Sequence, residues 1–174
     1  MEYAFLLRYR LPQDAGDVDE VVERLGAGGC DAALVGIGVP GRLALEFARE
    51  GASADAVLLS ALRDVRKAVP RATLVEIEPD LVGLTDAARL LGVSRQNLHK
   101  LRKTHPDTFP SPVHEGSTAI WHLEDLLSWL KAYQGYEVPA ALEELASTTK
   151  QFNLGRRIRE LESEIPEEAR SLIG

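Results

Sequence analysis

Hydrophobic positions in the first 80 residues follow two different periods. Apolar and polar side chains alternate, as in strands with one buried face, in four segments: 2–11, 31–38, 42–50 and 72–79. Apolar residues recur every three or four positions, as in amphipathic helices, in two segments: 18–26 and 53–70. Gly26 and Pro70 are expected to end these helices. The sequence therefore predicts the order strand, helix, strand, strand, helix, strand.

This order is the split βαβ pattern of ferredoxin-like domains. We therefore expect an α+β fold in which residues 1–79 form a four-stranded antiparallel sheet with both helices on one face. The run GAGGC at 26–30 follows a helix and precedes a strand, which is the reverse of a phosphate-binding glycine loop. We interpret it as a turn in which the single cysteine, Cys30, is a buried and inert thiol.

A second unit, residues 80–134, follows the linker EPDLVGL. In TDAARLLGVSRQNLHKLRK, Thr85 is expected to cap a first helix that ends at Gly92. Ser94 is expected to cap a second helix with Leu98 and Leu101 directed inward. The remaining surface of the second helix is polar or basic and includes no acid: Arg95, Gln96, Asn97, His99, Lys100, Arg102 and Lys103.

Two short helices joined by a tight turn, the second with a basic surface, meet the needs of a helix-turn-helix. Arginine can bind guanine through two hydrogen bonds, and glutamine or asparagine can bind adenine in the same way. The alternative is an ordinary helical hairpin with a solvated basic face. The next segment favours DNA binding, because PVHE and TAIW predict two strands around Gly116, followed by a helix from near His122. Such a wing can place His114, Ser117 and Thr118 along the phosphate backbone.

Residues 83–133 resemble the winged helix-turn-helix of excisionase and MerR-type regulators, including AlpA-like phage regulators. The resemblance rests on LTDAARLLGVSRQ, the F-P-x-P-V strand, the GS-containing wing and the terminal DLLSWL helix. It implies that Ser94, Arg95, Gln96 and His99 face DNA and that the wing grips the backbone. Two departures are a longer connection, THPDTFPSP, and Glu115 where a basic residue is expected. The candidate DNA-binding residues are Thr85, Ser94, Arg95, Gln96, Asn97, His99, Lys100, Arg102, Lys103, His114, Ser117 and Thr118.

The third part of the chain, residues 135–174, is expected to be a helical tail. Apolar residues are placed to line one side of two short helices broken near 153–155: Leu142, Leu145, Phe152, Leu154, Ile158, Leu161 and Ile165. Helices this short must pack on the chain's own domain, on a second copy or on another protein. Because a single winged module contacts few phosphates, we expect a homodimer on twofold-related half-sites of double-stranded DNA, assembled through the N-terminal domain or the tail.

Charge is unevenly distributed along a chain with a formal net charge of -7. Lysine and arginine minus aspartate and glutamate give 9 − 14 = −5 for residues 1–80, 6 − 5 = +1 for 81–134, and 5 − 8 = −3 for 135–174. The acidic N-terminal domain has no DNA-binding rationale of its own. The alternative function is therefore an antitoxin-like interaction protein that binds a partner protein and represses its own operon.

Other functional classes find little support in the sequence. No nucleophile with a nearby base, phosphate loop or metal-ligand spacing stands out, so we expect neither an enzyme nor a cofactor or metal site. The four histidines, His99, His105, His114 and His122, fall on different expected elements. No apolar run approaches the roughly 20 residues that span a bilayer, and the single cysteine suits a reducing compartment. We expect a cytoplasmic protein.

Overall fold

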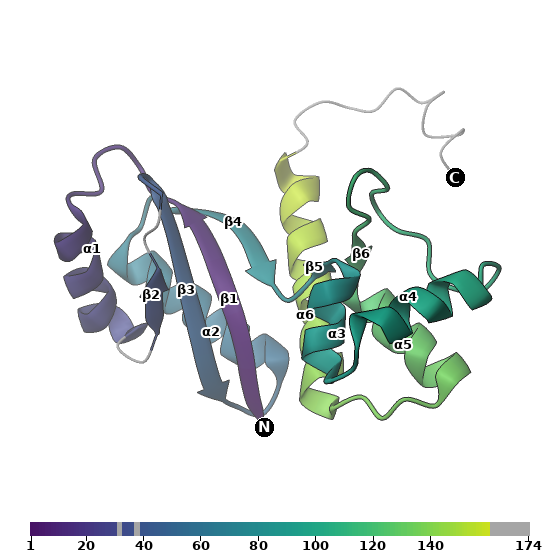
Figure 1. Ribbon diagram of the computed structural model, residues 1–174. Helices are drawn as coiled ribbons and strands as arrows, with labels where there is room; N and C mark the ends of the chain where they lie inside the picture. The colour runs from purple at the N-terminus through teal and green to yellow at the C-terminus, as the bar shows by residue number, and fades with distance from the viewer. Residues whose placement is uncertain (31–32, 37–38, 161–174) are drawn as a thin grey trace.

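The computed structural model describes residues 1–30, 33–36 and 39–160, which form an α+β fold (Figure 1). Its larger sheet contains four antiparallel strands: β1 (Glu2–Arg10), β2 (Leu34–Gly36), β3 (Arg42–Glu50) and β4 (Thr73–Glu78). Their order in the sheet is β2–β3–β1–β4. Strand β3 therefore lies between β1 and β2, which are consecutive in the chain.

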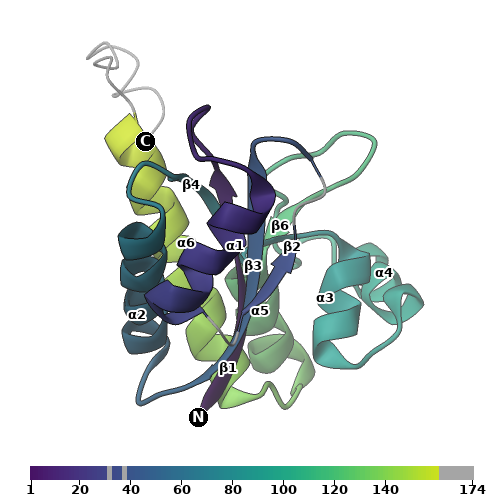
Figure 2. The same ribbon diagram turned by 90° about the vertical axis from the view of Figure 1, so that its left-hand side faces the viewer.

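The alternating pattern of β1 places four side chains in the core: Tyr3, Phe5, Leu7 and Tyr9. Helices α1 (Val18–Leu25) and α2 (Ala54–Ala68) cover this face of the sheet (Figure 2). The Asp17 side chain accepts a hydrogen bond from Glu20 N, and the Ser53 side chain accepts one from Ala56 N, so each helix has a capped start. The strands and helices expected here are confirmed within the described residues; positions 31, 32, 37 and 38 lie outside them.

The GAGGC run forms a turn, as predicted, and this turn is helical. Residues Gly26–Cys30 continue from α1 as a π-helical turn, in which Gly29 has a φ of 99°. Only glycine adopts this conformation without strain. The turn buries Cys30 against the sheet, as predicted.

The second unit contains β5 (Leu81–Val82), α3 (Leu84–Leu91), α4 (Arg95–Thr104), β6 (Trp121–His122) and α5 (Leu123–Gln134). The part of the linker after Asp80 is thus a strand, because β5 pairs with β6 in a small antiparallel sheet. Of the two strands expected at 112–115 and 118–121, Trp121 belongs to β6, and the rest is reduced to a single bridge between His114 and Ile120. Pro110 and Pro112 have no N–H to extend a ladder.

Helix α6 (Ala140–Glu160) is continuous, so the expected break near 153–155 is wrong; Leu161 and Ile165 lie outside the described residues. The helix lies beside α2 and β4 on one side and beside α5 on the other (Figures 1 and 2). Leu145 belongs to the core of the first unit, the sheet unit, which contains the four-stranded sheet. The next residue, Ala146, belongs to the core of the second unit. Helix α6 therefore packs within its own chain and joins the two cores. No helix among the described residues is long and apolar enough to cross a membrane.

Candidate nucleic-acid interface

The turn between α3 and α4 depends on Gly92. This residue has left-handed dihedral angles, φ 66° and ψ 27°, and its N–H donates to the last carbonyls of α3. The N–H of Val93 donates to Ala88 O over 2.9 Å, and the Val93 side chain packs against the core. A glycine in this conformation ends α3 and redirects the chain within two residues, as the sequence predicts.

The start of α3 differs from the prediction. Gly83 precedes the helix in an extended conformation, without a side-chain cap, and Thr85 lies in the first turn. Thr85 is not the cap because strand β5 ends at Val82 and the helix begins two residues later. Its side chain is exposed on the surface of α3.

Helix α4 begins as predicted. The Ser94 hydroxyl accepts a hydrogen bond from Asn97 N over 3.2 Å. Leu98 is buried, and the half-buried Leu101 packs against the same core. These contacts fix which face of α4 points to solvent.

The solvent face of α4 presents free donors. Five exposed side chains form no hydrogen bond or ion pair with any described residue: Arg95, Gln96, His99, Lys100 and Lys103. The first turn of α4 contains no acid, whereas the first turn of each of the other five described α-helices contains at least one. The positive end of the helix dipole and the basic side chains therefore meet no compensating carboxylate in this turn.

Two of the predicted DNA contacts instead have partners within the chain. Asn97 donates from Nδ2 to the hydroxyl of Tyr136. Arg102 forms an ion pair with Glu115 and lies over the Trp121 ring, 5.1 Å from its centroid. These contacts hold α4 against neighbouring segments, so neither side chain is as available as Arg95 or Lys100.

The segment expected to form the wing lies close to the last turn of α4. The Arg102–Glu115 ion pair links the two, and Trp121 Nε1 donates to Pro110 O over 2.9 Å at the base of the segment. His114, Ser117 and Thr118 are exposed. The structure thus brings this loop together with the basic end of α4, but it gives the unexpected Glu115 a partner.

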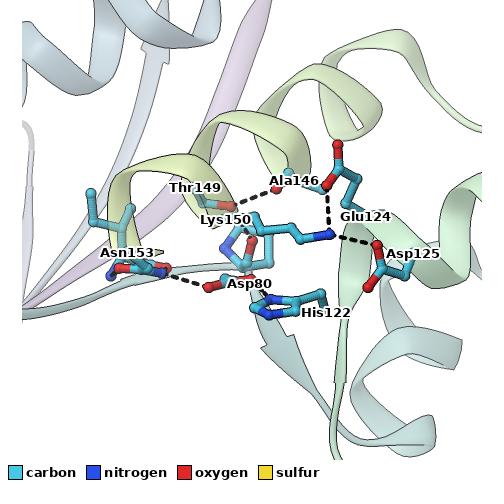
Figure 3. A network of polar contacts seen from close by, with 10 residues as sticks. Asp80, His122, Glu124, Asp125, Ala146, Thr149, Lys150 and Asn153 are labelled. Carbon is cyan, nitrogen blue, oxygen red and sulfur yellow. Dashed lines mark hydrogen bonds and ion pairs between the residues drawn. The ribbon is translucent and has the colours of Figure 1, made fainter. Parts of the chain in front are cut away.

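Sequence reasoning missed a buried polar network between the two units (Figure 3). His122 Nδ1 lies 2.6 Å from Asp80 Oδ1, and Asn153 Nδ2 donates to Asp80 Oδ2 over 2.8 Å. Asn153 also bonds both backbone groups of Ile77, accepting from N over 3.0 Å and donating to O over 2.8 Å. Its amide therefore acts as a partner for the edge of β4. The signal in the sequence for this network was an asparagine in the middle of an otherwise helical pattern.

A second group of charges extends the network to α5. Lys150 Nζ lies 2.9 Å from Glu124 and 2.5 Å from Asp125. Burial by itself lowers the pKa of Lys150, but its hydrogen bonds to Asp125 and Glu124 outweigh burial and raise it. Thr149 donates from its hydroxyl to Pro79 O over 2.6 Å. Helix α6 is thus bonded to β4, to the linker and to the start of α5.

Within the described residues, no group of three or more His, Cys, Asp or Glu is placed to hold a metal ion. Comparison with protein families, with curated proteins and with solved structures found no match to this chain. The geometry of the described residues is therefore the basis for assigning a function.

Proposed function

We propose that the protein is a sequence-specific DNA-binding transcriptional regulator, with a ferredoxin-like N-terminal domain and a winged helix-turn-helix. The position of β3 between β1 and β2 is that of a split βαβ unit, which supports the first assignment. The observation that carries the function is the solvent face of α4, which is basic, free of acids and presents five side chains without a partner among the described residues. This helix also lies on the side of the molecule away from the four-stranded sheet (Figure 1), so the sheet leaves it accessible.

The exposed side chains suggest a division of roles on DNA. Arg95 and Gln96 lie in the first turn of α4, next to the Ser94 cap, where a recognition helix enters the major groove. They are the proposed base readers, because arginine matches guanine and glutamine matches adenine. Lys100 and Lys103 suit phosphate contacts, which add affinity without sequence preference. His99, one turn beyond Arg95, is placed to approach the same groove.

Because the side chains of Asn97 and Arg102 bond to groups within the chain, we assign them a role in supporting α4. Arg102 and Glu115 neutralise one another while fixing the wing to α4. The wing then contributes neutral or titratable donors, His114, Ser117 and Thr118, instead of a strong positive charge. This leaves one copy with few phosphate contacts, which supports a homodimer that binds two half-sites.

The proposal is tested by selecting bound fragments from the native genome and measuring affinity for the selected site. Arg95→Ala and Gln96→Ala should each cost about 1–3 kcal/mol and relax preference at particular base pairs. Lys100→Ala should weaken all sequences alike and reduce the salt slope by about 1. Arg63→Ala, an exposed arginine on α2, is the matched control and should change neither property. Absence of any sequence preference at moderate salt would refute the proposal.

A further inference from the structure

A groove lies between α2 and the C-terminal half of α6, far from the face of α4. Its volume is about 790 Å³, within the range of about 300–1,000 Å³ that is usual for small-molecule sites. Tyr9 and Leu74 from the sheet contribute to its lining, as do Leu62 and Val69 of α2 and Phe152 of α6. Aromatic and aliphatic side chains thus surround a space large enough for a compact organic molecule.

Positive charge gathers at one end of this groove. Arg66 comes from the last turn of α2, and Arg156 and Arg159 come from α6. Arg66 and Arg159 form no ion pair with any described residue, and Arg156 pairs only with Glu160 on its own helix. The other carboxylate at the groove, Asp55, lies in the first turn of α2, eleven residues and about 16 Å along the helix from Arg66.

Arg156 adds a separate observation. Its Nε is buried and has no hydrogen-bond partner among the described residues. A buried donor without an acceptor costs about 1–3 kcal/mol, so a bound acceptor toward which the Arg156 guanidinium can turn would be favoured. A carboxylate supplies two acceptor oxygens and can take paired hydrogen bonds from guanidinium groups.

We propose that this groove binds a small amphipathic carboxylate. The charged head lies among Arg66, Arg156 and Arg159, and the apolar body lies over Leu62, Leu74 and Phe152. Phe152 immediately precedes Asn153, so the ligand would contact the turn of α6 that holds the edge of β4 and Asp80. The proposal does not depend on DNA binding, and its test uses no DNA.

Gly155 offers a selective way to close the groove. It lies in α6 and lines the groove, and a Cβ built on it would meet nothing within 4 Å. Gly155→Leu should therefore occupy part of the groove without a clash at its Cβ, while its higher helix propensity maintains the thermal midpoint of the folded protein. This variant separates loss of the site from loss of the fold.

The probe is 2-naphthoate, titrated into the full-length protein by calorimetry, with neutral 2-naphthol as its matched control. We expect saturable binding of naphthoate that is at least about tenfold tighter than binding of naphthol, because charged hydrogen bonds contribute only to the anion. Arg66→Gln and Arg159→Gln should each weaken naphthoate by about tenfold and leave naphthol unchanged. Gly155→Leu should weaken binding of both. Arg63→Gln, at an exposed position on α2 that does not line the groove, should have no effect.

Three results would overturn the proposal. The first is no saturable naphthoate binding by the folded wild-type protein. The second is naphthoate affinity that is unchanged by Gly155→Leu or by both arginine substitutions. The third combines two measurements: the wild-type protein is a dimer by light scattering that does not bind naphthoate, and Gly155→Leu is a monomer. That result would assign the groove to a second copy of the chain.

Discussion

Asn153 provides a direct test of how α6 holds the two units together. Its side chain is 4% exposed and makes three hydrogen bonds: two to the backbone of Ile77 and one to Asp80. Asn153→Ala removes all three and leaves the N–H and C=O of Ile77 and one carboxylate oxygen of Asp80 without these partners. Helix propensity opposes this effect, because alanine is the better helix former by about 0.7 kcal/mol at most.

The expected cost follows from these contacts. Leaving one buried partner unsatisfied costs about 1–3 kcal/mol, and contacts in one network do not add fully, so three bonds amount to roughly 3–6 kcal/mol. Subtracting the gain in helix propensity leaves a net loss of about 2–5 kcal/mol. This is a large part of the roughly 5–15 kcal/mol that stabilises a typical domain. Gln151→Ala, an exposed position in the same helix, is the control and should change stability by less than about 0.5 kcal/mol.

Urea unfolding followed by two probes distinguishes loss of stability from loss of coupling. Both tryptophans, Trp121 and Trp129, belong to the core of the second unit, so their fluorescence reports that unit alone. Far-ultraviolet circular dichroism reports both units. The two transitions should coincide in the wild type and separate in Asn153→Ala, because the edge of β4 is no longer bonded to α6. A loss below about 1 kcal/mol, or coincident transitions in the variant, would refute this account of the network.

Three further substitutions each test one local feature of the fold. Asn153→Asp should destabilise the protein at neutral pH, because it places a second carboxylate beside Asp80, and acidification should relieve part of the loss. The hydrogen bond between Tyr3 and Glu144 raises the pKa of Tyr3 to about 12 and lowers the pKa of Glu144. This hydrogen bond should therefore stabilise the protein fully between about pH 5 and 10. The stabilisation should fall below that range as Glu144 is protonated and above it as Tyr3 ionises. Tyr3→Phe removes the bond, so the urea midpoint of this variant should lack this contribution at every pH. Gly92→Ala should cost about 1–2 kcal/mol in urea unfolding from its positive φ alone, since a Cβ there meets no neighbour; an unchanged midpoint would contradict the left-handed turn.

Local signals in the sequence predicted much of the fold. The two hydrophobic periods specify the β1 and α2 segments, because each element buries one face against the same core. Gly92 and Ser94 mark the turn between α3 and α4, since a left-handed helix end and a hydroxyl cap depend on one residue each. These features need no knowledge of distant parts of the chain.

Features that depend on distant partners were not predictable in this way. The continuity of α6 was missed because Asn153 and Gly155 are poor helix formers, and the buried amide is stabilised by Ile77, 76 residues away. The pairing of β5 with β6 involves only two residues from each strand, too few for a periodic pattern. Within the candidate site, the exposed side of α4 was predicted from helical spacing. The ion pair between Arg102 and Glu115 was not, because it depends on the 113–120 segment lying beside the helix.

The polar network also bears on the proposed binding of DNA by an acidic chain with a small basic face. A twofold dimer gains affinity from its second copy only if both α4 helices reach successive major grooves, about 34 Å apart, at the same time. If two copies associate through the sheet unit, the distance between their α4 helices depends on the contacts between the two units of each chain. The bonds that α6 makes to Ile77, Asp80 and the start of α5 resist rotation between those units. In the proposed dimer, a rigid junction would offset the small number of basic residues on α4, because a flexible junction would lower the effective concentration of the second α4 helix.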